Sequence, residues 1–329
     1  MINFQVTGAG ELTKVNSQCN LEHVDNVKVK ITKCLITGAD IADYLGLTGR
    51  ETPFTPSKIA TAQITETLQE SNYFTKGTKV FLAPETYYDL PVCEREKGLV
   101  GSNDGFLKEF AVVPKKFAHI LPQNVTENDA LFIYHINLAL SVIDSLTLEK
   151  GEYVAIVGGN ILANIIAQLV SYYKAVPVVI DENDENLELA AKTDVYYTLK
   201  TSKNLESEIL SITGGRRCRK AVYITDSETG VDIIGKVSSD GAKTCVTGFY
   251  ETNEKFSLAV PFNKQLEIKF VRGGVENVGT AINLLAQKAL QLNYYDLSDY
   301  KLDYVQKHFE NHAEKFKNGS FKEFSVNLL

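Results

Sequence analysis

Short apolar runs at strand spacing dominate the first part of the chain. Up to about Pro122, β-branched and aromatic residues alternate with polar ones in stretches that are separated by glycine, proline and asparagine. The clearest are VKVKITKCLITG (27–38), KIATAQITETL (58–68), TKVFLAP (78–84) and FLKEFAVVP (106–114). Because side chains alternate between the two faces of a strand, this pattern is typical of β structure. The sequence therefore predicts an all-β unit over residues 1–122.

The hydrophobic period changes after this point. Thr126 and Asp129 are spaced as a capping box, and apolar residues then recur at helical spacing to about Leu146. A strand ending in YVAIVGGN (153–160), a helix and a second strand, VPVVIDENDEN (176–186), follow within about thirty residues, the length of a βαβ unit.

Strands and helices continue to alternate beyond this unit. Strands are predicted at KAVYITD (220–226), AKTCVTGF (242–249) and QLEIKFVRGG (265–274), with a helix near residues 229–238 between the first two. Alternation of this kind favours a parallel sheet with helices on its faces. The sequence thus predicts an α/β fold with a doubly wound domain over residues 123–289.

The C-terminal stretch is predicted to return to the first unit. Apolar residues from Val278 to Leu292 recur at three and four positions, which indicates a helix of about four turns. A second helix is expected over residues 303–317, followed by the strand FKEFSVNLL (321–329). This last strand has no partner nearby in sequence, so we expect it to pair with the N-terminal β unit.

Composition narrows the classes of function. The chain has 329 residues, 44% hydrophobic and 23% charged, with a formal net charge of -7, which disfavours a nucleic-acid partner. No apolar stretch reaches the roughly 18 residues of a membrane span, and the N-terminus lacks a signal-peptide core, so a cytoplasmic protein without a membrane partner is expected. The five cysteines contain no CxxC pair and are expected to be free thiols.

The strongest local signal is the glycine turn VAIVGGNILA followed by VVID. In a dinucleotide-binding βαβ unit, glycines allow a tight turn, a close approach of the pyrophosphate and close packing of helix on strand. Asp181 ends the second strand, where a carboxylate can bind both ribose hydroxyls and would repel a 2'-phosphate, so NAD is favoured over NADP. The alternative is a βαβ turn that binds nothing. The candidate cofactor-binding residues are Gly158, Gly159, Asn160, Leu162 and Asp181, with Asn160 in place of the second glycine.

Six segments in a fixed order carry a resemblance that runs over almost the whole chain. They are VKVKITKCLITGADIADYLG, FTPSKIATAQITE, TKGTKVFLAP, NDGFLKEFAVVPKKFAHILPQNV, ITGGRRCRKAVYITD and HFENHAEKFKNGSFKEFSVNLL. In their order and spacing the chain resembles the medium-chain dehydrogenase/reductase superfamily, the zinc alcohol dehydrogenase-like proteins. The resemblance implies a GroES-like β-barrel catalytic domain over residues 1–122, completed by about 290–329, and a Rossmann-type dinucleotide-binding domain over 123–289. It also implies a nicotinamide dinucleotide, a small-molecule substrate, and a homodimer joined edge to edge through QLEIKFVRGG.

Departures from the family pattern concern the metal. Zinc-dependent members have a cysteine in the first site segment, a His-Glu pair in the second, and a Cys or Glu on the helix before the nucleotide domain. By register, those positions here hold Thr37, Lys58 with Ile59, and Tyr134. Zinc is bound by thiolate, imidazole or carboxylate, and these residues offer none of them. Of the four structural-zinc cysteines this chain has Cys93 alone. We therefore expect no zinc at either site.

The resemblance to zinc-free members implies a hydride transfer between nicotinamide and a carbonyl, enone or alcohol, with a sugar or polyol derivative as one substrate class. A metal-free mechanism needs a hydrogen-bond donor for the carbonyl oxygen and a proton source. The candidate catalytic residues are Lys58, Tyr134 and Thr37, with His135 beside them. The alternatives are a surface Lys58 or a Lys58 paired with Asp40, and a Tyr134 and His135 that serve helix packing.

A second function hypothesis comes from the same losses. The proton-relay positions of the zinc enzymes hold Ala39 and Ala42, and the second glycine of the turn is Asn160. A chain without these groups could be a catalytically silent dehydrogenase-like subunit that acts as a binding or assembly protein. Side chains that fill the pyrophosphate site would favour this second hypothesis.

Overall fold

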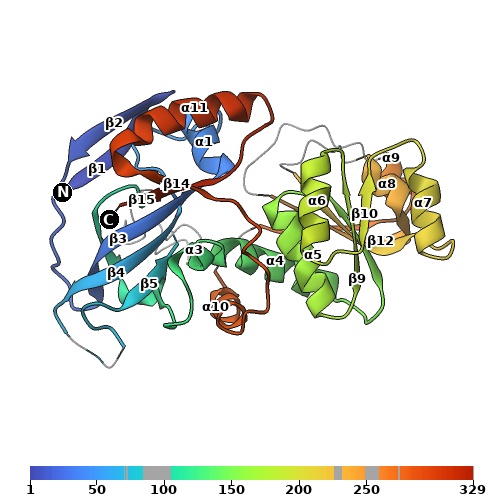
Figure 1. The fold of residues 1–329 in the computed structure, drawn as a ribbon, viewed down its shortest axis with the longest axis horizontal. Helices are drawn as coiled ribbons and strands as arrows, with labels where there is room; N and C mark the ends of the chain where they lie inside the picture. The colour runs from blue at the N-terminus through green and yellow to red at the C-terminus, as the bar shows by residue number, and fades with distance from the viewer. Residues whose placement is uncertain are drawn as a thin grey trace. The chain divides into compact units, whose positions relative to one another are not determined.

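The fold was analysed in a computed structural model, which describes residues 1–69, 71, 73–83, 105–225, 232–248, 259–272 and 275–328. The chain divides into two compact units (Figure 1). The first comprises Met1–Tyr134, Gly274–Ala286 and Asp296–Leu329, and the second His135–Gly273 and Gln287–Tyr295. None of the helices in the described ranges combines the length and apolar character needed to cross a membrane.

The first unit is built on a seven-stranded mixed sheet. Its strand order is β14-β15-β3-β4-β5-β7, and β6 also pairs with β3. A separate hairpin, β1 with β2, precedes it in the chain. The β structure predicted for the N-terminal part is confirmed, although this part also contains a short helix over Gly38–Tyr44. The strands are β1 (Ile2–Gly8), β2 (Glu11–Asn16), β3 (Asn26–Ile36), β4 (Ile59–Thr67), β5 (Lys79–Leu82), β6 (Phe110–Pro114), β7 (Ala118–Ile120), β14 (Ser298–Lys301) and β15 (Phe324–Asn327).

The last strand returns to the first unit as predicted. β15 pairs antiparallel with β3, with Phe324 opposite Ile36. Helix α11 (Val305–Lys317) covers this pairing, because its Phe309 ring lies 5.9 Å from the ring of Phe324 and 5.3 Å from that of Tyr44. Tyr44 belongs to α1 (Gly38–Tyr44), so one aromatic cluster fixes the closing strand, the closing helix and α1 in a common core.

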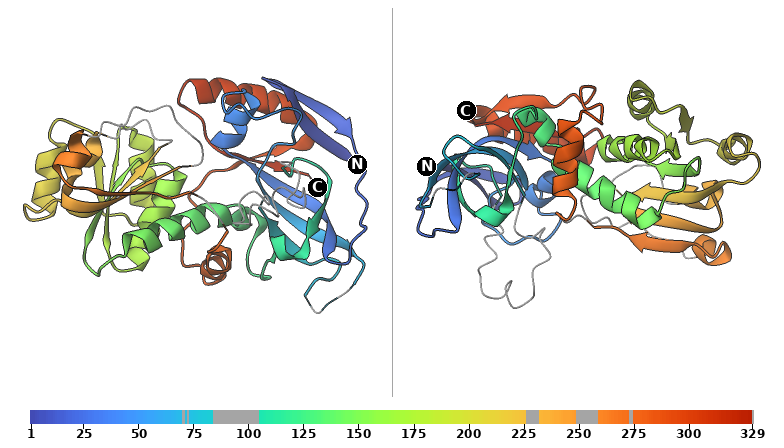
Figure 2. Two further views of the ribbon diagram at one scale, coloured as in Figure 1. Left: turned by 180° about the vertical axis from the view of Figure 1, so that it is seen from behind. Right: turned by 90° about the horizontal axis from the view of Figure 1, so that it is seen from below.

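The second unit is a doubly wound parallel sheet, as predicted. Its order, β10-β9-β8-β11-β12-β13, reverses direction at the β8–β11 pair, and ligands of such sheets bind beyond the carboxyl ends at this point. The views in Figure 2 show helices on both faces. The elements are β8 (Tyr153–Val157), α5 (Ile161–Tyr172), β9 (Val176–Asp181), α6 (Asp184–Lys192), β10 (Tyr197–Lys200), α7 (Leu205–Ile212), β11 (Cys218–Ile224), α8 (Ile233–Val237), β12 (Ser238–Thr247), α9 (Ala259–Asn263) and β13 (Glu267–Phe270). β13 is one of the two edge strands of this order, the other being β10, and the homodimer expected through β13 stays a prediction.

Two predicted helices differ in extent from the observed ones. The helix expected from Thr126 to Leu146 is two helices, α3 (Glu127–Ala130) and α4 (Ile133–Leu146), although the Thr126–Asp129 capping box is present. The helix expected to reach Leu292 ends early, as α10 (Val278–Ala286). The chain turns there because Lys288 adopts a positive φ of 52° and cannot continue a right-handed helix.

Beyond this turn, residues 287–295 dock on the second unit through buried amides. The hydroxyl of Tyr295 donates to Asn164 Oδ1, and Gln168 Nε2 donates to the same hydroxyl oxygen at 2.9 Å. Gln291 N donates to Gln168 Oε1 at 2.7 Å, and its side chain reaches Asp194. Asn164 and Gln168 lie on α5, so this segment is fixed directly to the helix that follows the glycine turn.

Loss of the Tyr295 hydroxyl should weaken this docking. We expect Tyr295→Phe to lower the free energy of unfolding by about 1–3 kcal/mol, because the buried amide groups of Asn164 and Gln168 each lose one hydrogen-bond partner. The neighbouring Tyr294 is 43% exposed, and Tyr294→Phe should change stability by less than about 0.5 kcal/mol. Urea unfolding of the two variants measures the difference, and equal stabilities would contradict the role given to Tyr295.

Candidate functional site

The glycine turn lies between the end of β8 and the start of α5. Gly158 has a φ of 109°, a conformation that favours glycine, and its N–H donates to Ile180 O at 2.8 Å. Asn160 is the N-cap of α5, and its side-chain oxygen accepts a hydrogen bond from Ala163 N at 3.0 Å. The amide that replaces the second glycine of the motif therefore caps its own helix.

Asp181 ends β9 beside this turn and is almost fully buried. Its Oδ2 accepts a hydrogen bond from Gly159 N at 2.6 Å, and its Oδ1 accepts from Asn183 N at 2.7 Å and from Asn186 Nδ2 at 3.3 Å. A carboxylate offers about four lone-pair positions, so one position on Oδ2 is left for a ligand hydroxyl. The carboxylate thus stabilises the turn and retains an acceptor for a ribose.

Gly159 is required by packing as well as by any cofactor. A Cβ at this position would lie 2.7 Å from Asn186 Cβ and 3.1 Å from Asp181 Cβ. The first distance is too short for carbon atoms of a folded chain and the second is tight, so any larger residue would push α6 away from the turn. In the sequence motif, a glycine at this position lets a pyrophosphate approach the backbone. In the structure, the close approach of Asn186 also requires a glycine here, with or without a ligand.

The start of α5 can receive an anion. Its cap uses the N–H of Ala163, whereas the N–H groups of Ile161 and Leu162 have no hydrogen-bond acceptor in the described part of the chain. The first N–H groups of a helix carry partial positive charge and bind phosphate groups well. Together with the remaining acceptor of Asp181, these donors fit the pyrophosphate and ribose of a dinucleotide.

Two buried carboxylates organise the candidate site of the first unit. Thr37 is the N-cap of α1, and both its N–H and its hydroxyl donate to Asp40 Oδ2, at 3.0 and 2.9 Å. The other oxygen of Asp40 accepts from Ser57 N at 2.9 Å. Because Thr37 gives its hydroxyl hydrogen to Asp40, its oxygen can act toward a substrate as an acceptor.

Lys58 is paired with Asp43, one turn of α1 further on. Its Nζ lies 3.1 Å from Asp43 Oδ2, and the lysine side chain is 26% exposed. Asp43 also accepts hydrogen bonds from Thr48 Oγ1 at 2.6 Å and Arg50 Nη1 at 2.9 Å. The ion pair of Lys58 is therefore with Asp43, and Asp40, which the sequence offered as its partner, binds Thr37 and Ser57.

The pKa values of Asp40 and Asp43 are shifted in opposite directions. Burial raises the pKa of Asp40 above its ordinary value, although the positive charge of Lys58 and the hydrogen bonds from Thr37 act against this. Burial also acts to raise the pKa of Asp43, but Lys58, Thr48 and Arg50 together hold the pKa of this carboxyl below its ordinary value. Lys58 thus lowers the pKa of both acids and balances the negative charge of the cluster.

The remaining predicted residues lie on α4. Tyr134 is the last residue of the first unit and is buried, and His135 is fully buried at the start of the second, where the sequence had suggested a half-buried histidine. The structure brings Thr37 and Lys58 together around the two acids, and it brings Gly158, Gly159, Asn160, Leu162 and Asp181 together at the turn. The first group lies in the first unit and the second group in the second unit.

Asp40, Asp43 and the residues that bind their carboxylates form a group that we call the acid cluster. Sequence reasoning missed part of it. Asp43, Thr48 and Arg50 were not singled out, although Asp40 and Asp43 are three residues apart and so share one face of a helix. Arg50 also stacks on Phe54, with its guanidinium carbon 4.0 Å from the ring centre. A pair of acids at this spacing, followed by basic residues, was the signal available in the sequence.

The residues at the family's metal positions do not fit zinc. Threonine is a poor ligand of zinc, and the side chain of Ile59 has no donor atom. Lys58 places its ammonium group next to the carboxylates that could otherwise face a metal. In the ranges that the structure describes, no three His, Cys, Asp or Glu side chains are grouped so that they could hold a metal ion. Cys93, expected near a second zinc site, lies outside the described residues.

Three known proteins that are similar to this chain are dehydrogenases or dehydrogenase-like proteins by their names. No family model matches the chain. It is 20% identical over 230 residues to an uncharacterized zinc-type alcohol dehydrogenase-like protein of Haemophilus influenzae, covering 65% of this chain and 67% of the relative. A short chain alcohol dehydrogenase of Escherichia coli CFT073, solved with NADH, superposes with a TM-score of 0.81 at 17% identity over 99% of both chains. Galactitol-1-phosphate dehydrogenase of Escherichia coli gives a TM-score of 0.80 at 17% identity, over 99% of this chain and 100% of the other.

Removal of the Lys58 charge should destabilise the acid cluster. We expect Lys58→Met to lower the free energy of unfolding by about 1–3 kcal/mol at pH 7, because Asp40 and Asp43 stay buried with less compensation. The loss should shrink as the pH falls toward 4, because Asp40, whose pKa is raised by burial, takes up a proton first and then no longer needs the charge of Lys58. Lys200→Met is the control, since its ion pair with Asp184 is exposed and should contribute less than about 0.5 kcal/mol. Denaturant titrations across this pH range test it, and a loss independent of pH would count against the charge argument.

Proposed function

We propose that this chain, which has the fold of the medium-chain dehydrogenase/reductase superfamily, is an NAD(H)-dependent oxidoreductase that works without zinc. It would transfer hydride between nicotinamide and a carbonyl, enone or alcohol. The observation that carries the proposal is the end of β8, where two N–H groups at the start of α5 and one acceptor position of Asp181 are available to a ligand. The fold shared with an NADH-bound alcohol dehydrogenase supports it.

The preference for NAD over NADP rests on Asp181. This carboxylate is buried beside the turn, and it accepts hydrogen bonds on both oxygens. It can accept one more from a ribose hydroxyl, whereas a 2'-phosphate at the same place would meet a negative charge. In the part of the chain that the structure describes, no hydrogen bond or ion pair joins Asp181 to an Arg or Lys that would offset this charge.

On the substrate side, the acid cluster supplies the polar groups. Lys58 would stabilise negative charge on the substrate oxygen, and Tyr134 would supply the proton. Thr37 would accept a hydrogen bond from the substrate, because its own hydroxyl hydrogen is given to Asp40. The nicotinamide, when bound, supplies or accepts the hydride. Polyols and their phosphate esters are the first substrates to assay, since galactitol-1-phosphate dehydrogenase shares the fold.

A second candidate function is a silent dehydrogenase-like subunit that binds or assembles with other proteins. Two observations favour it. The amide of Asn160 occupies the start of α5 as a cap, and the N–H of Gly159 is already bonded to Asp181. Both contacts give backbone N–H groups of the turn and of the first helical turn a hydrogen-bond partner from the chain itself. The binding of NADH separates the two functions.

Zinc independence can be measured directly. We expect the purified protein to contain far less than one equivalent of zinc, because threonine, lysine, isoleucine and tyrosine stand at the family's ligand positions. Mass-spectrometric metal analysis of protein grown with added zinc provides the number. One tightly held equivalent, resistant to dialysis against a chelator, would refute this part of the proposal.

Binding of NADH should respond to charge at the start of α5. In a fluorescence titration we expect saturable NADH binding by the wild type and a dissociation constant raised at least about tenfold in Ile161→Asp. An acidic residue at the first helical position favours the helix but repels the pyrophosphate, so folding is preserved. Ile161→Asn is the matched neutral control and should bind nearly as the wild type. If the wild type binds neither NADH nor NADPH at millimolar concentration, the silent function takes precedence.

A further inference from the structure

Lys220 is a buried lysine whose charge has no partner among the described residues. It lies on β11, and its exposed fraction is 9%. The other Asp, Glu, Lys or Arg side chains buried to this degree, in the described ranges, are Asp40, Asp43 and Asp181, and each of these accepts several hydrogen bonds. Lys220 makes no hydrogen bond and no ion pair in the part of the chain that the structure describes. A buried charge without compensation is costly, which sets Lys220 apart from the three acids.

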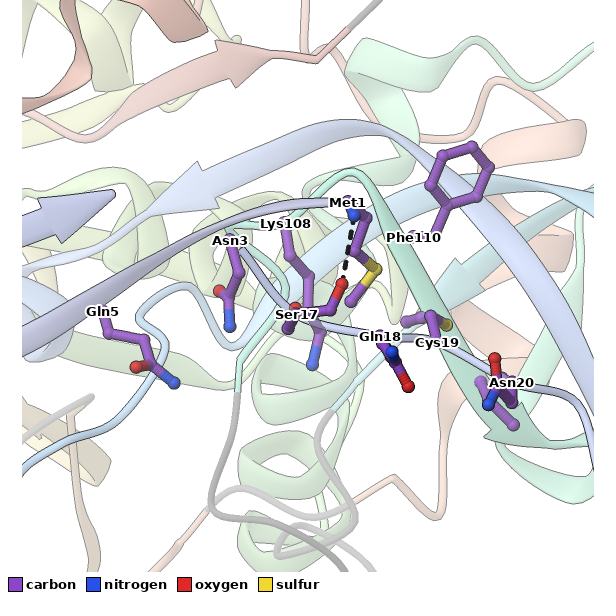
Figure 3. Close-up of a pocket in the computed structure, with 11 residues that line it drawn as sticks. Met1, Asn3, Gln5, Ser17, Gln18, Cys19, Asn20, Lys108 and Phe110 are labelled. Carbon is purple, nitrogen blue, oxygen red and sulfur yellow. Dashed lines mark hydrogen bonds between the residues drawn. The ribbon is translucent and has the colours of Figure 1, made fainter. Parts of the chain in front are cut away.

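Lys108, in the first unit, differs from Lys220 in this respect. It lines a polar hollow beside β1, together with residues 17–20 (Figure 3). Lys108 already interacts within the chain, and the hydroxyl of Ser17 at the same hollow is fully enclosed, so neither group is available to a ligand there. The charge of Lys108 is therefore accounted for by the chain itself, and the charge of Lys220 is not.

A second lysine stands directly opposite Lys220 on the neighbouring strand. Lys220 on β11 is the register partner of Lys243 on β12, so the two side chains point to the same face of the sheet. Lys243 likewise makes no hydrogen bond or ion pair with a described residue. Like charges on directly opposite residues repel each other. An anion between the two ammonium groups would remove this repulsion.

A third lysine extends this cationic face to β13. Lys269 is the register partner of Cys245, which follows Lys243 by two residues and shares its face. Burial raises the pKa of Cys245 to about 11, and the charges of Lys269 and Lys220 act to lower it, so both ammonium groups lie near this thiol. The same thiol lies 4.0 Å from Val142 O, which places helix α4 against this face. Three positive charges therefore gather on β11, β12 and β13, beside α4.

The nearby acids leave these charges without an ion pair. Glu267 on β13 is the register partner of Lys243, and its negative charge acts to raise the pKa of Cys245. Glu152, just before β8, accepts a hydrogen bond from Glu149 N at 3.2 Å. Among the described residues, neither Glu267 nor Glu152 forms an ion pair with any of the three lysines. The lysines thus carry charge that an additional anion could neutralise.

We propose that Lys220, Lys243 and Lys269 bind an oxyanion group, phosphate or carboxylate, on this face of the second unit. An oxyanion supplies both the negative charge and the acceptor oxygens that the ammonium groups lack. Lys220 is the centre of the site, because its stem is held by packing while its ammonium nitrogen is not fully enclosed and can meet an ion. Lys269 is exposed and adds attraction from the edge strand. The site includes no residue of the glycine turn or of the acid cluster.

Urea unfolding in inorganic phosphate tests the proposal without any nucleotide. Phosphate replaces chloride at constant ionic strength, and the unfolding midpoint of the wild type should rise saturably, because an ion that binds only the folded state stabilises it. In Lys220→Met this saturable increment should disappear. The midpoint of Lys220→Met in chloride should equal or exceed that of the wild type, since an uncompensated buried charge has been removed. General stabilisation by phosphate does not saturate and should be the same in every variant.

Two further variants keep the test decisive if Lys220→Met folds poorly. Lys243 is half-buried, so Lys243→Gln should fold normally, and the phosphate concentration that gives half of the increment should rise at least about tenfold. Lys236→Gln is the matched control. Lys236 is an exposed lysine on α8, which packs on the opposite face of the sheet, and its loss should leave the increment unchanged.

The start of α5 could also take up phosphate, so Ile161→Asp is measured in parallel and should keep the increment. Citrate at equal ionic strength shows whether carboxylates bind as phosphate does, and an increment from either anion that Lys220→Met or Lys243→Gln loses supports the proposal. An increment that both lysine variants retain would overturn it. The absence of any saturable increment in the wild type would overturn it as well, because solvent alone would then hydrate Lys220. The NADH titration is independent of both results.

Discussion

The contact between Asp181 and Gly159 is the constraint on which the second unit depends. The carboxylate at the end of β9 accepts the N–H of the turn that ends β8, at 2.6 Å. This contact holds two neighbouring carboxyl ends of the sheet together and fixes the direction in which α5 begins. At the same place Asn186 on α6 lies against Gly159, which leaves no room for a side chain there. A dinucleotide would use a geometry that the apoprotein already stabilises for its own reasons.

The first unit balances the charge of two buried acids with cations of its own. Asp40 and Asp43 remain buried on α1, and Lys58 and Arg50 supply positive charge from the protein itself. Buried acids without a compensating charge would be costly. In the proposed metal-free reaction, a lysine at this place would provide hydrogen bonding and electrostatic stabilisation where a zinc ion would act as a Lewis acid.

Much of the fold could be predicted from the sequence, because hydrophobic period and glycine position report local structure directly. The parallel sheet, the return of β15 to β3 and the resemblance to dehydrogenases are confirmed. The end of α10 could not be predicted, because the apolar pattern continues through Leu292 while Lys288 takes a positive φ. The pairing of Lys58 with Asp43 was missed because the spacing of the two acids shows that they share a helix face, but not which of them the lysine reaches. The catalytic and cofactor roles of the named residues stay predictions.

The path of residues 287–295 has a consequence for dissecting the protein. The chain leaves the first unit after α10, docks on the second through Gln291 and Tyr295, and returns to the first at β14. No single cut therefore yields both units as continuous pieces. A fragment that stops at residue 273 would leave Asn164 and Gln168 on α5 without the partners that Gln291 and Tyr295 supply. Isolated expression of the nucleotide unit would need residues 287–295 restored through a linker, or a circular permutation that joins them to it.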